Sequence, residues 1–375
     1  MRFRLIDDPA GLDRLCRGLG RERRIALDCE ASGFHRYSDR LCLLQLTTSS
    51  ATHIVDTLAL DPAPALRGPL ADPETQVLMH GADYDLRLLD RDLGLSVRGL
   101  FDTQVAAALL GEKSTGLAAL LERYHGVKLS KKHQRADWAR RPLPGDMLEY
   151  AAADTEHLAA LADRLRARLE RADRLEWADE ECRLLERTCW SEEGGGEDPA
   201  CRVRGARELG PREVTALRQA LAWRDRIARA RDRAPFRVAG DDTLVKIAAD
   251  APASVSELKA VRGMNSELAR REGADLLRRL ARVAQLPETE LTGYPHRSGA
   301  LRPPQDVEQR AERLKRVRNR WAEELEIERG VLLPNALLLE LARRRPRSLA
   351  ELAEVAGLRK WQAELLGAAL LAALA

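Results

Sequence analysis

Four acidic residues and one tyrosine have the side-chain types and spacing that metal-dependent chemistry requires. They are Asp28, Glu30, Asp85, Tyr150 and Asp154. Each lies in a largely apolar stretch, where a carboxylate is rarely placed unless a cation holds it there. No nearby Lys or Arg is an evident partner, so we expect divalent metal, with two ions as the counterions. Two-metal carboxylate sites break or form phosphodiester bonds.

The spacing of the first and last pairs predicts shared faces. Asp28 and Glu30 are two residues apart in a strand pattern, so both side chains point to the same face. Tyr150 and Asp154 are four residues apart in a helical pattern, which makes them neighbours on one face. Each pair alone is a weak indicator, because an acidic pair can be plain edge polarity and Tyr150 can be a packed helix residue.

Asp85 lies in the segment 79–86, where a strand pattern ends at Gly81 and a helical pattern begins. The dipole of a helix favours a carboxylate near its start. An alternative exists for one of the two acids in this segment, because Asp83 could be the N-cap of the helix. We expect Asp85 to belong to the metal site.

The composition limits the architecture without identifying a partner. A chain of 375 residues is too long for one ordinary core, so two or three domains are expected. Lys and Arg number 62 against 59 Asp and Glu, and the net charge of +3 points to no ligand. Only eight of the basic residues are Lys, so an Arg cluster is a weak sign of nucleic-acid binding in this chain.

The sequence predicts a cytoplasmic location. No apolar run reaches the ~18 residues of a membrane-spanning helix, and residues 1–8 contain no signal-peptide core. The six cysteines form no Cys-x-x-Cys pair and have no matching His spacing, so neither a zinc site nor a disulfide framework is expected. We expect no membrane contact and no nucleotide cofactor.

The first half of the chain alternates strand-like and helix-like segments. Short apolar runs predict strands at 25–29, 41–47, 53–56 and 76–79. Helical periodicity predicts helices at 84–93, 104–110, 117–124 and, as one segment, from 147 to about 169. Strands that are first consecutive and then alternate with helices indicate an α/β domain with a mixed sheet.

Two polar breaks divide the rest of the chain. Residues 191–199 are acidic and Gly-rich, and everything beyond them has helical character. A second break, rich in Pro and Gly, spans about 287–304. The expected order is a domain at 1–190, a linker at 191–206, a helical domain at 207–286, a linker at 287–304 and a second helical domain at 305–375.

The two helical segments repeat each other at a constant offset of 94 residues. Pro252, Ser254, Glu257, Leu258, Val261 and Gly263 recur as Pro346, Ser348, Glu351, Leu352, Val355 and Gly357. A constant offset without a gap indicates a duplicated helical module. Chance similarity between Leu- and Ala-rich helices is the alternative, and the shared Pro and Gly positions disfavour it.

The order of the motifs resembles the tyrosine-bearing branch of the DEDD exonuclease superfamily. Residues 26–30, 80–85 and 150–154 match its three motifs. The histidine branch places His five residues before the last Asp, where this chain has Glu149. Residues 130–144 resemble the ribonuclease D family and its eukaryotic exosome-associated relatives, and the duplicated module resembles the HRDC domain.

The resemblance to the ribonuclease D family covers nearly the whole chain. It implies an α/β exonuclease domain of ribonuclease H-like fold, with a mixed sheet flanked by helices, followed by two all-α HRDC-type helical bundles. The implied activity is that of a 3′-to-5′ exoribonuclease, which hydrolyses phosphodiester bonds with two Mg²⁺ or Mn²⁺ ions and releases nucleoside 5′-monophosphates. The implied partner is RNA, as tRNA precursors or other structured RNA with a 3′ tail.

The same resemblance assigns roles to the motif residues. Asp28, Glu30 and Asp154 are expected to hold the ion that activates water, while Asp28 bridges to a second ion served by Asp85. Tyr150 is expected to position the attacking water, since a tyrosine with a pKa of ~10 is a poor base near neutrality.

Further residues are candidates for substrate contacts. The basic segment 131–135 could grip phosphates near the 3′ end. The expected substrate-binding residues are Phe34, His80, Lys131, Lys132, Gln134 and Arg135. For Phe34 an ordinary connecting loop is the alternative. Trp138 could stack on a base, but a core position is favoured.

The helical modules carry arginine stripes that could follow an RNA backbone or be solvated faces. The stripes contain Arg224, Arg226, Arg229, Arg231 and Arg233 in the first module, and Arg313, Arg316 and Arg320, beside Lys315 and Arg318, in the second. Two other functions remain open, a DNA exonuclease and a non-catalytic RNA-binding scaffold. The paired modules favour RNA, and the presence of all five site residues disfavours a scaffold.

Overall fold

The computed structural model describes residues 3–191, 198–295 and 303–375. The chain forms two compact units. Unit 1 contains Met1–Glu30, Leu41–Trp190 and Leu301–Ala375, and unit 2 contains Ala31–Arg40 and Ser191–Ala300. The second helical module therefore groups with the N-terminal domain, and the short segment 31–40 groups with the first module. The sequence analysis predicts neither grouping.

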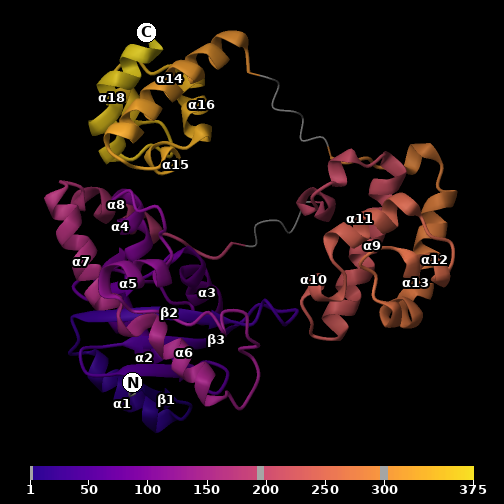
Figure 1. The fold of residues 1–375 in the computed structure, drawn as a ribbon, viewed down its shortest axis with the longest axis horizontal. Helices are drawn as coiled ribbons and strands as arrows, with labels where there is room; N and C mark the ends of the chain where they lie inside the picture. The colour runs from indigo at the N-terminus through magenta and orange to yellow at the C-terminus, as the bar shows by residue number, and fades with distance from the viewer. Residues whose placement is uncertain (1–2, 192–197, 296–302) are drawn as a thin grey trace. The chain divides into compact units, whose positions relative to one another are not determined.

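A six-stranded mixed sheet is the centre of unit 1 (Figure 1). Its strands are β1 (Phe3–Ile6), β2 (Arg24–Ala31), β3 (Leu41–Thr47), β4 (Thr52–Asp56), β5 (Gln76–Met79) and β6 (Leu100–Asp102). Their order is β1-β4-β3-β2-β5-β6, with β3 and β4 antiparallel and the pairs β1/β4, β2/β5 and β5/β6 parallel. This confirms the predicted mixed sheet, and it puts β2 and β5, which carry or precede three of the site residues, side by side.

The sequence analysis missed the two edge strands. β1 is only half-buried, because Arg4 and Leu5 are exposed, and β6 has three residues. Neither is long or regular enough to show a strand pattern.

Eight α-helices complete the N-terminal domain. They are α1 (Pro9–Leu19), α2 (Ala63–Ala71), α3 (Asp83–Leu93), α4 (Thr103–Leu109), α5 (Leu117–His125), α6 (Gly145–Glu156), α7 (Leu158–Arg171) and α8 (Leu175–Leu185). The single helix expected from 147 to about 169 is wrong, because the chain leaves the helical conformation at His157 (φ −101°, ψ 3°) and continues as α7. No Gly or Pro marks this break, so the sequence pattern could not show it.

The small residues of α6 allow it to lie close to the sheet. Ala151 and Ala152 are fully buried and pack in one cluster with Cys42, Leu43 and Ile54 of β3 and β4. This close approach brings the next turn of α6, which carries Asp154, toward the sheet.

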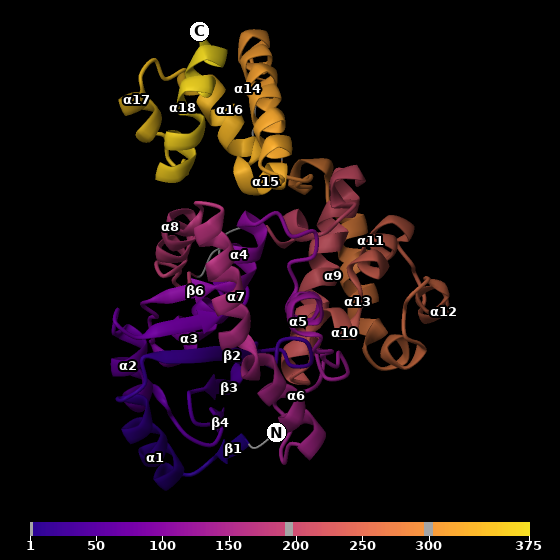
Figure 2. The same cartoon turned by 60° about the vertical axis from the view of Figure 1, so that its left-hand side comes forward.

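The two helical modules have the same element order (Figure 2). The first contains α9 (Pro211–Ala230), α10 (Pro235–Val238), α11 (Asp241–Asp250), α12 (Val255–Ala260) and α13 (Ser266–Gln285). The second contains α14 (Gln305–Glu324), α15 (Arg329–Leu332), α16 (Asn335–Arg344), α17 (Leu349–Ala353) and α18 (Lys360–Leu374). Short 3₁₀ turns at Pro199–Arg202, Ala206–Glu208 and Glu288–Glu290 flank the first. Each helix of the second module begins 94 residues after its counterpart, as a duplication requires.

One arginine in each module is structural and does not belong to an RNA-binding stripe. The bonds run from Arg224 to the carbonyl of Ala239 (3.0 Å) and Asp241 (2.6 Å), and from Arg318 to the carbonyl of Leu333 (3.1 Å) and Asn335 (2.7 Å). Both arginines thus connect the first long helix to the start of the third helix at the same offset. Arg318 is also buried, so it cannot meet a ligand at the surface.

An ion pair fastens the segment before α6 to the sheet. The Arg141 guanidinium donates to both carboxylate oxygens of the buried Asp56 at 2.5 and 2.6 Å, and to the carbonyl of Trp138 at 2.7 Å. These bonds hold the segment that carries the basic residues 131–135 and the core residue Trp138.

Replacement of Arg141 by Ala should therefore destabilise the protein by about 2–3 kcal/mol, because it leaves a buried carboxylate without its cation. Urea unfolding followed by circular dichroism measures this loss. The neighbouring exposed Arg140→Ala is the matched control and should change the free energy of unfolding by less than about 0.5 kcal/mol. Equal effects of the two substitutions would contradict a specific role for the Arg141–Asp56 pair.

Candidate metal and active site

Three carboxylates from distant segments of chain meet beside the sheet. Asp28 and Glu30 come from β2, and Asp154 comes from α6. Each offers a carboxylate oxygen, and the three oxygens lie within 4.8 Å of one another. All three side chains are partly buried. Oxygen-only groups at this spacing suit a hard divalent cation such as Mg²⁺ or Mn²⁺.

Asp85 is near this cluster but outside the group of three oxygens. It is buried in the first turn of α3. Its pKa is raised well above the ordinary value, first by burial and then by the charge of Asp28, and its own charge in turn raises the pKa of Glu30. The structure thus brings all four predicted carboxylates into one electrostatic cluster, with Asp85 at its edge.

Burial makes this cluster hard to ionise without a cation. It raises the pKa of Asp28 to about 7 and, together with the charge of Asp28, raises that of Asp154 to about 8. The pKa of Glu30 is well above its ordinary value, again mainly through burial and then through Asp28 and Asp154. A divalent cation would offset both the lost solvation and the mutual repulsion, so the donor set fits such an ion.

Tyr150 is suited to donate a hydrogen bond. Its hydroxyl bonds to Asp154, the residue one helical turn later. Burial first, and then the charges of Asp154 and Glu30, raise the pKa of Tyr150 above its usual range. The phenol therefore stays protonated at neutral pH, which excludes it as a general base in this environment and leaves it able to orient a ligand.

His80 has a defined tautomer at the end of β5. The Thr103 hydroxyl has one proton and donates it to the carbonyl of Met79 (3.0 Å), so it accepts from Nδ1 of His80 (2.9 Å). Burial lowers the pKa of His80, and the neutral ring then has a bare Nε2. That buried atom has no hydrogen-bond partner among the described residues.

Asp102 holds two elements next to the site in place, and this role was not predicted from the sequence. It is almost fully buried, and its carboxylate accepts from the backbone N–H groups of Gly81 (3.0 Å) and Ala82 (2.7 Å) as well as Gln104 (2.7 Å). It thereby fixes the turn before α3, where Gly81 has φ +73°, and the start of α4. An Asp directly before a helical pattern is the signal that could have identified it.

The alternative in which Asp83 is the N-cap of α3 does not hold. Ala82 occupies the cap position and offers no side-chain bond. Asp83 is the first residue of α3 and pairs with Arg87 at 3.1 Å on the surface. Asp102 holds the N–H groups of Gly81 and Ala82, the two residues that precede α3.

A cavity of about 430 Å³ adjoins the carboxylates. Its lining includes Asp28, His80, Lys131, Gln134, Tyr150 and Asp154. A neighbouring cavity of about 280 Å³ is lined by Lys132 and His133 and shares Tyr150 and Asp154 with the first. Four of the six expected substrate-binding residues therefore line a cavity beside the cluster.

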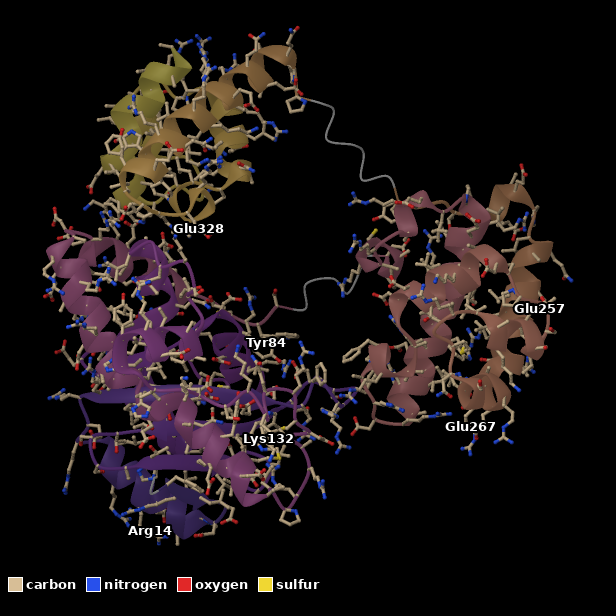
Figure 3. All side chains as sticks on the ribbon, viewed as in Figure 1. Arg14, Tyr84, Lys132, Glu257, Glu267 and Glu328 are labelled. Atoms are coloured by element: carbon tan, nitrogen blue, oxygen red, sulfur yellow. The ribbon has the colours of Figure 1, made fainter. Side chains whose placement is uncertain are left out.

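The remaining residues of that segment have other positions. Lys132, labelled in Figure 3, pairs with Asp146 at 2.6 Å, which partly offsets its charge. Arg135 is exposed and lines neither cavity. Trp138 is 2% exposed and packs in the core below Tyr150, with ring centroids 6.0 Å apart, so the favoured core position is confirmed.

Phe34 belongs to unit 2 and lines neither cavity. Its ring lies 5.3 Å from that of Phe236, and the guanidinium of Arg237 lies 4.7 Å above it. Arg237 also donates to the carbonyl of Phe34 at 2.8 Å. The segment that directly follows Glu30 is thus packed on the first helical module.

Metal-free protein should lose stability as the pH rises from about 4 to about 8. The folded pKa values of Asp28 and Asp154 lie above the ordinary value of 3.8. The folded state therefore binds these protons more tightly, and the stability present at low pH is lost as the carboxyls ionise. Thermal unfolding in a chelator, at pH 5 and pH 8, measures this.

The substitution Asp28→Asn should raise the unfolding temperature of chelated protein at pH 8 by several degrees and change it little at pH 5, because it removes the repelling charge. Asp13→Asn, at an exposed position of α1, is the matched control and should have no pH-dependent effect. A chelated protein that is equally stable at both pH values would contradict the cluster's electrostatics.

Comparison with known proteins agrees with this geometry. A family model described as 3′-5′ exonuclease matches residues 3–170, and a model of the HRDC domain matches residues 214–280 and 307–374. The chain is 34% identical to ribonuclease D of Granulibacter bethesdensis, over 80% of this chain and 76% of the relative.

Two further similarities cover almost the whole chain. Ribonuclease D of Pseudomonas paraeruginosa is 30% identical over 98% of this chain and 96% of its own length. The crystal structure of Escherichia coli RNase D, described as an exoribonuclease involved in structured RNA processing, has a TM-score of 0.70 at 27% identity. It covers 100% of this chain and 99% of the E. coli chain.

Proposed function

The chain belongs to the ribonuclease D family of 3′-5′ exoribonucleases, and we propose that Asp28, Glu30, Asp85, Tyr150 and Asp154 carry its hydrolysis of phosphodiester bonds. The observation that supports this most is the meeting of three carboxylate oxygens within 4.8 Å from segments more than a hundred residues apart. Such a cluster is unfavourable by itself, so it is best explained by a cationic ligand.

We propose that Asp28, Glu30, Asp154 and Asp85 hold two divalent ions, Mg²⁺ or Mn²⁺. When bound, such ions supply an activated water and neutralise the charge that develops on the phosphate. Asp28 has the central position, because its charge affects the pKa of Glu30, Asp85 and Asp154. By resemblance to the exonuclease family, Asp28 would serve both ions and Asp85 would serve the second.

The protein's own residues orient the reactants. Tyr150 donates its proton to Asp154, so its hydroxyl oxygen can accept a hydrogen bond from an incoming water beside Asp154. Lys131 and Gln134 line the same cavity and can contact the phosphate on the 3′ side of the RNA. His80 presents an unpartnered acceptor at the wall of that cavity, and the hydroxyl groups of ribose are suitable donors to it.

The proposed substrates are tRNA precursors or other structured RNA with a single-stranded 3′ tail, and the proposed products are nucleoside 5′-monophosphates. The proposed location is the cytoplasm, which the six free cysteines support. None of the described helices is long and apolar enough to cross a membrane.

The substitutions Asp28→Asn and Asp154→Asn should each reduce hydrolysis by at least about a thousandfold, because they remove a charged ligand from the reacting centre. A time course on 3′-labelled and 5′-labelled RNA, with and without chelator, measures the rate and the polarity. Asp83→Asn is the matched control, since Asp83 is an exposed acid two residues from Asp85. Wild-type rates for Asp28→Asn in Mg²⁺ would overturn the assignment.

Tyr150→Phe should reduce turnover by about a hundredfold, because it removes only the orienting hydroxyl. Isothermal titration with Mn²⁺ should show metal affinity close to that of the unmodified protein. A loss of metal affinity as large as that of Asp154→Asn would assign Tyr150 a role in holding the metal instead.

A further inference from the structure

The first helical module contains a basic groove between its two long helices. The groove has a volume of about 470 Å³ and lies between α9 and α13. Gln219 lines it from α9, while Asp275, Arg278, Arg279 and Arg282 line it from α13. Three guanidinium groups thus face one carboxylate, so the groove has an excess of positive charge.

The three arginines differ in exposure and in the number of partners that their guanidinium groups bond. Arg279 is half-buried and donates to Asp275 (3.1 Å) and Gln219 (3.4 Å), so it forms part of the wall. Arg278 has a side chain that is 72% exposed and reaches the edge of Asp275 at 3.3 Å. Arg282 is exposed, and no carboxylate among the described residues lies within ion-pair distance of it. Arg278 and Arg282 are four residues apart, so they project from one face of α13.

The second module lacks this groove chemistry although its fold is the same. The positions 94 residues after Asp275, Arg278 and Arg279 are Ala369, Ala372 and Ala373. Helix α13 has five arginines against three acidic residues, whereas α18 has one lysine and one glutamate. Helix α18 therefore has the same position in its module as α13 but carries far fewer charged residues.

The same helix of the second module is used for contact with the N-terminal domain. The rings of Trp361 and Trp177 are stacked with centroids 4.6 Å apart. Glu181 accepts from Arg359 (3.1 Å) and from Nε1 of Trp361 (3.0 Å), and Glu180 accepts from the first N–H groups of α18. The contact involves the first residues of α18, and it attaches the second module to the N-terminal domain.

We propose that the two modules have separate roles, and that the groove between α9 and α13 of the first module binds the phosphate backbone of the RNA substrate. The proposal rests on the exoribonuclease function and concerns the part of the RNA that lies outside the exonuclease cavity. Guanidinium groups match phosphate oxygens in geometry and charge, and Thr215 and Gln219 offer further hydrogen bonds. The second module is the attachment that holds the C-terminal end of the chain on the N-terminal domain.

The test measures binding of a fluorescent RNA hairpin with a 3′ tail to the full-length chain. All variants carry Asp154→Asn, so that the RNA is not consumed. The groove variant is Arg278→Ala with Arg282→Ala. The matched control is Arg316→Ala with Arg320→Ala, which removes two arginines at the same spacing from α14 of the second module.

The groove variant should raise the Kd of the hairpin about tenfold, since it removes two phosphate contacts. The slope of log Kd against log salt should fall by roughly 1.5, because about 0.7–0.9 of an ion is released per phosphate contact. The control should change the Kd by less than about twofold. In the background with Asp154 intact, the groove variant should hydrolyse saturating short RNA at the unmodified rate.

Three results would overturn the proposal. An unchanged Kd in the groove variant excludes the groove, and an equal loss in the control excludes separate roles for the modules. Binding of a polyglutamate peptide that depends on Arg278 and Arg282, without such dependence for RNA, would make the groove a protein-docking site. Failure of the unmodified chain to hydrolyse short RNA at all would instead refute the exoribonuclease assignment, which the rate measurement detects separately.

Discussion

The mutual repulsion of partly buried carboxylates is the constraint on which the N-terminal domain depends. Asp28, Glu30 and Asp154 approach one another closely, and burial raises the pKa of each. A fold that packs such groups together gives up stability at the site and must recover it elsewhere. The apolar sheet and the close packing of α6, through Ala151 and Ala152, supply that stability. The domain is therefore a frame around a charge arrangement that protonation or a bound cation relieves.

A second set of buried carboxylates, Asp102 and Asp56, differs from the site cluster because each has hydrogen-bond donors that satisfy it. Asp102 is almost fully buried, yet four backbone N–H groups satisfy its carboxylate. The carboxylate of Asp56 is likewise satisfied, in its case by the guanidinium of Arg141. These two hydrogen-bonded carboxylates thus hold the turns and segments that surround the site carboxylates. This contrast separates structural acids from site acids more clearly than burial alone does.

The spacing in the sequence predicted which candidate site residues share a face, because it matches the period of the strand or helix that carries them. Asp28 and Glu30 are two residues apart in a strand pattern, and Tyr150 and Asp154 are four residues apart in a helical pattern. Each spacing predicts that the two side chains lie on the same face of their element. The duplication of the helical module could also be recognised from the sequence, because a constant offset between similar residues can be seen without knowing the fold. The edge strand β6 was not predicted because it has only three residues, and the break at His157 was not predicted because no Gly or Pro marks it. The bonds of Asp102 to Gly81 and Ala82 were not predicted because they join two different segments of the chain. For the arginines, the sequence could not separate Arg318, which is buried and bonded to Leu333, from its exposed neighbours, because its burial depends on contacts with a later segment.

The stacked Trp177 and Trp361 have a consequence for how this chain can vary. The interface joins α8 to the start of α18, and two adjacent glutamates there accept hydrogen bonds from the second module. A shortened chain without that module would expose an indole face to water and leave both glutamates without these donors. Loss of the second helical module would therefore expose an apolar surface on α8 as well as remove a helical bundle. Such a surface favours self-association, so the N-terminal domain depends on the second module to cover it.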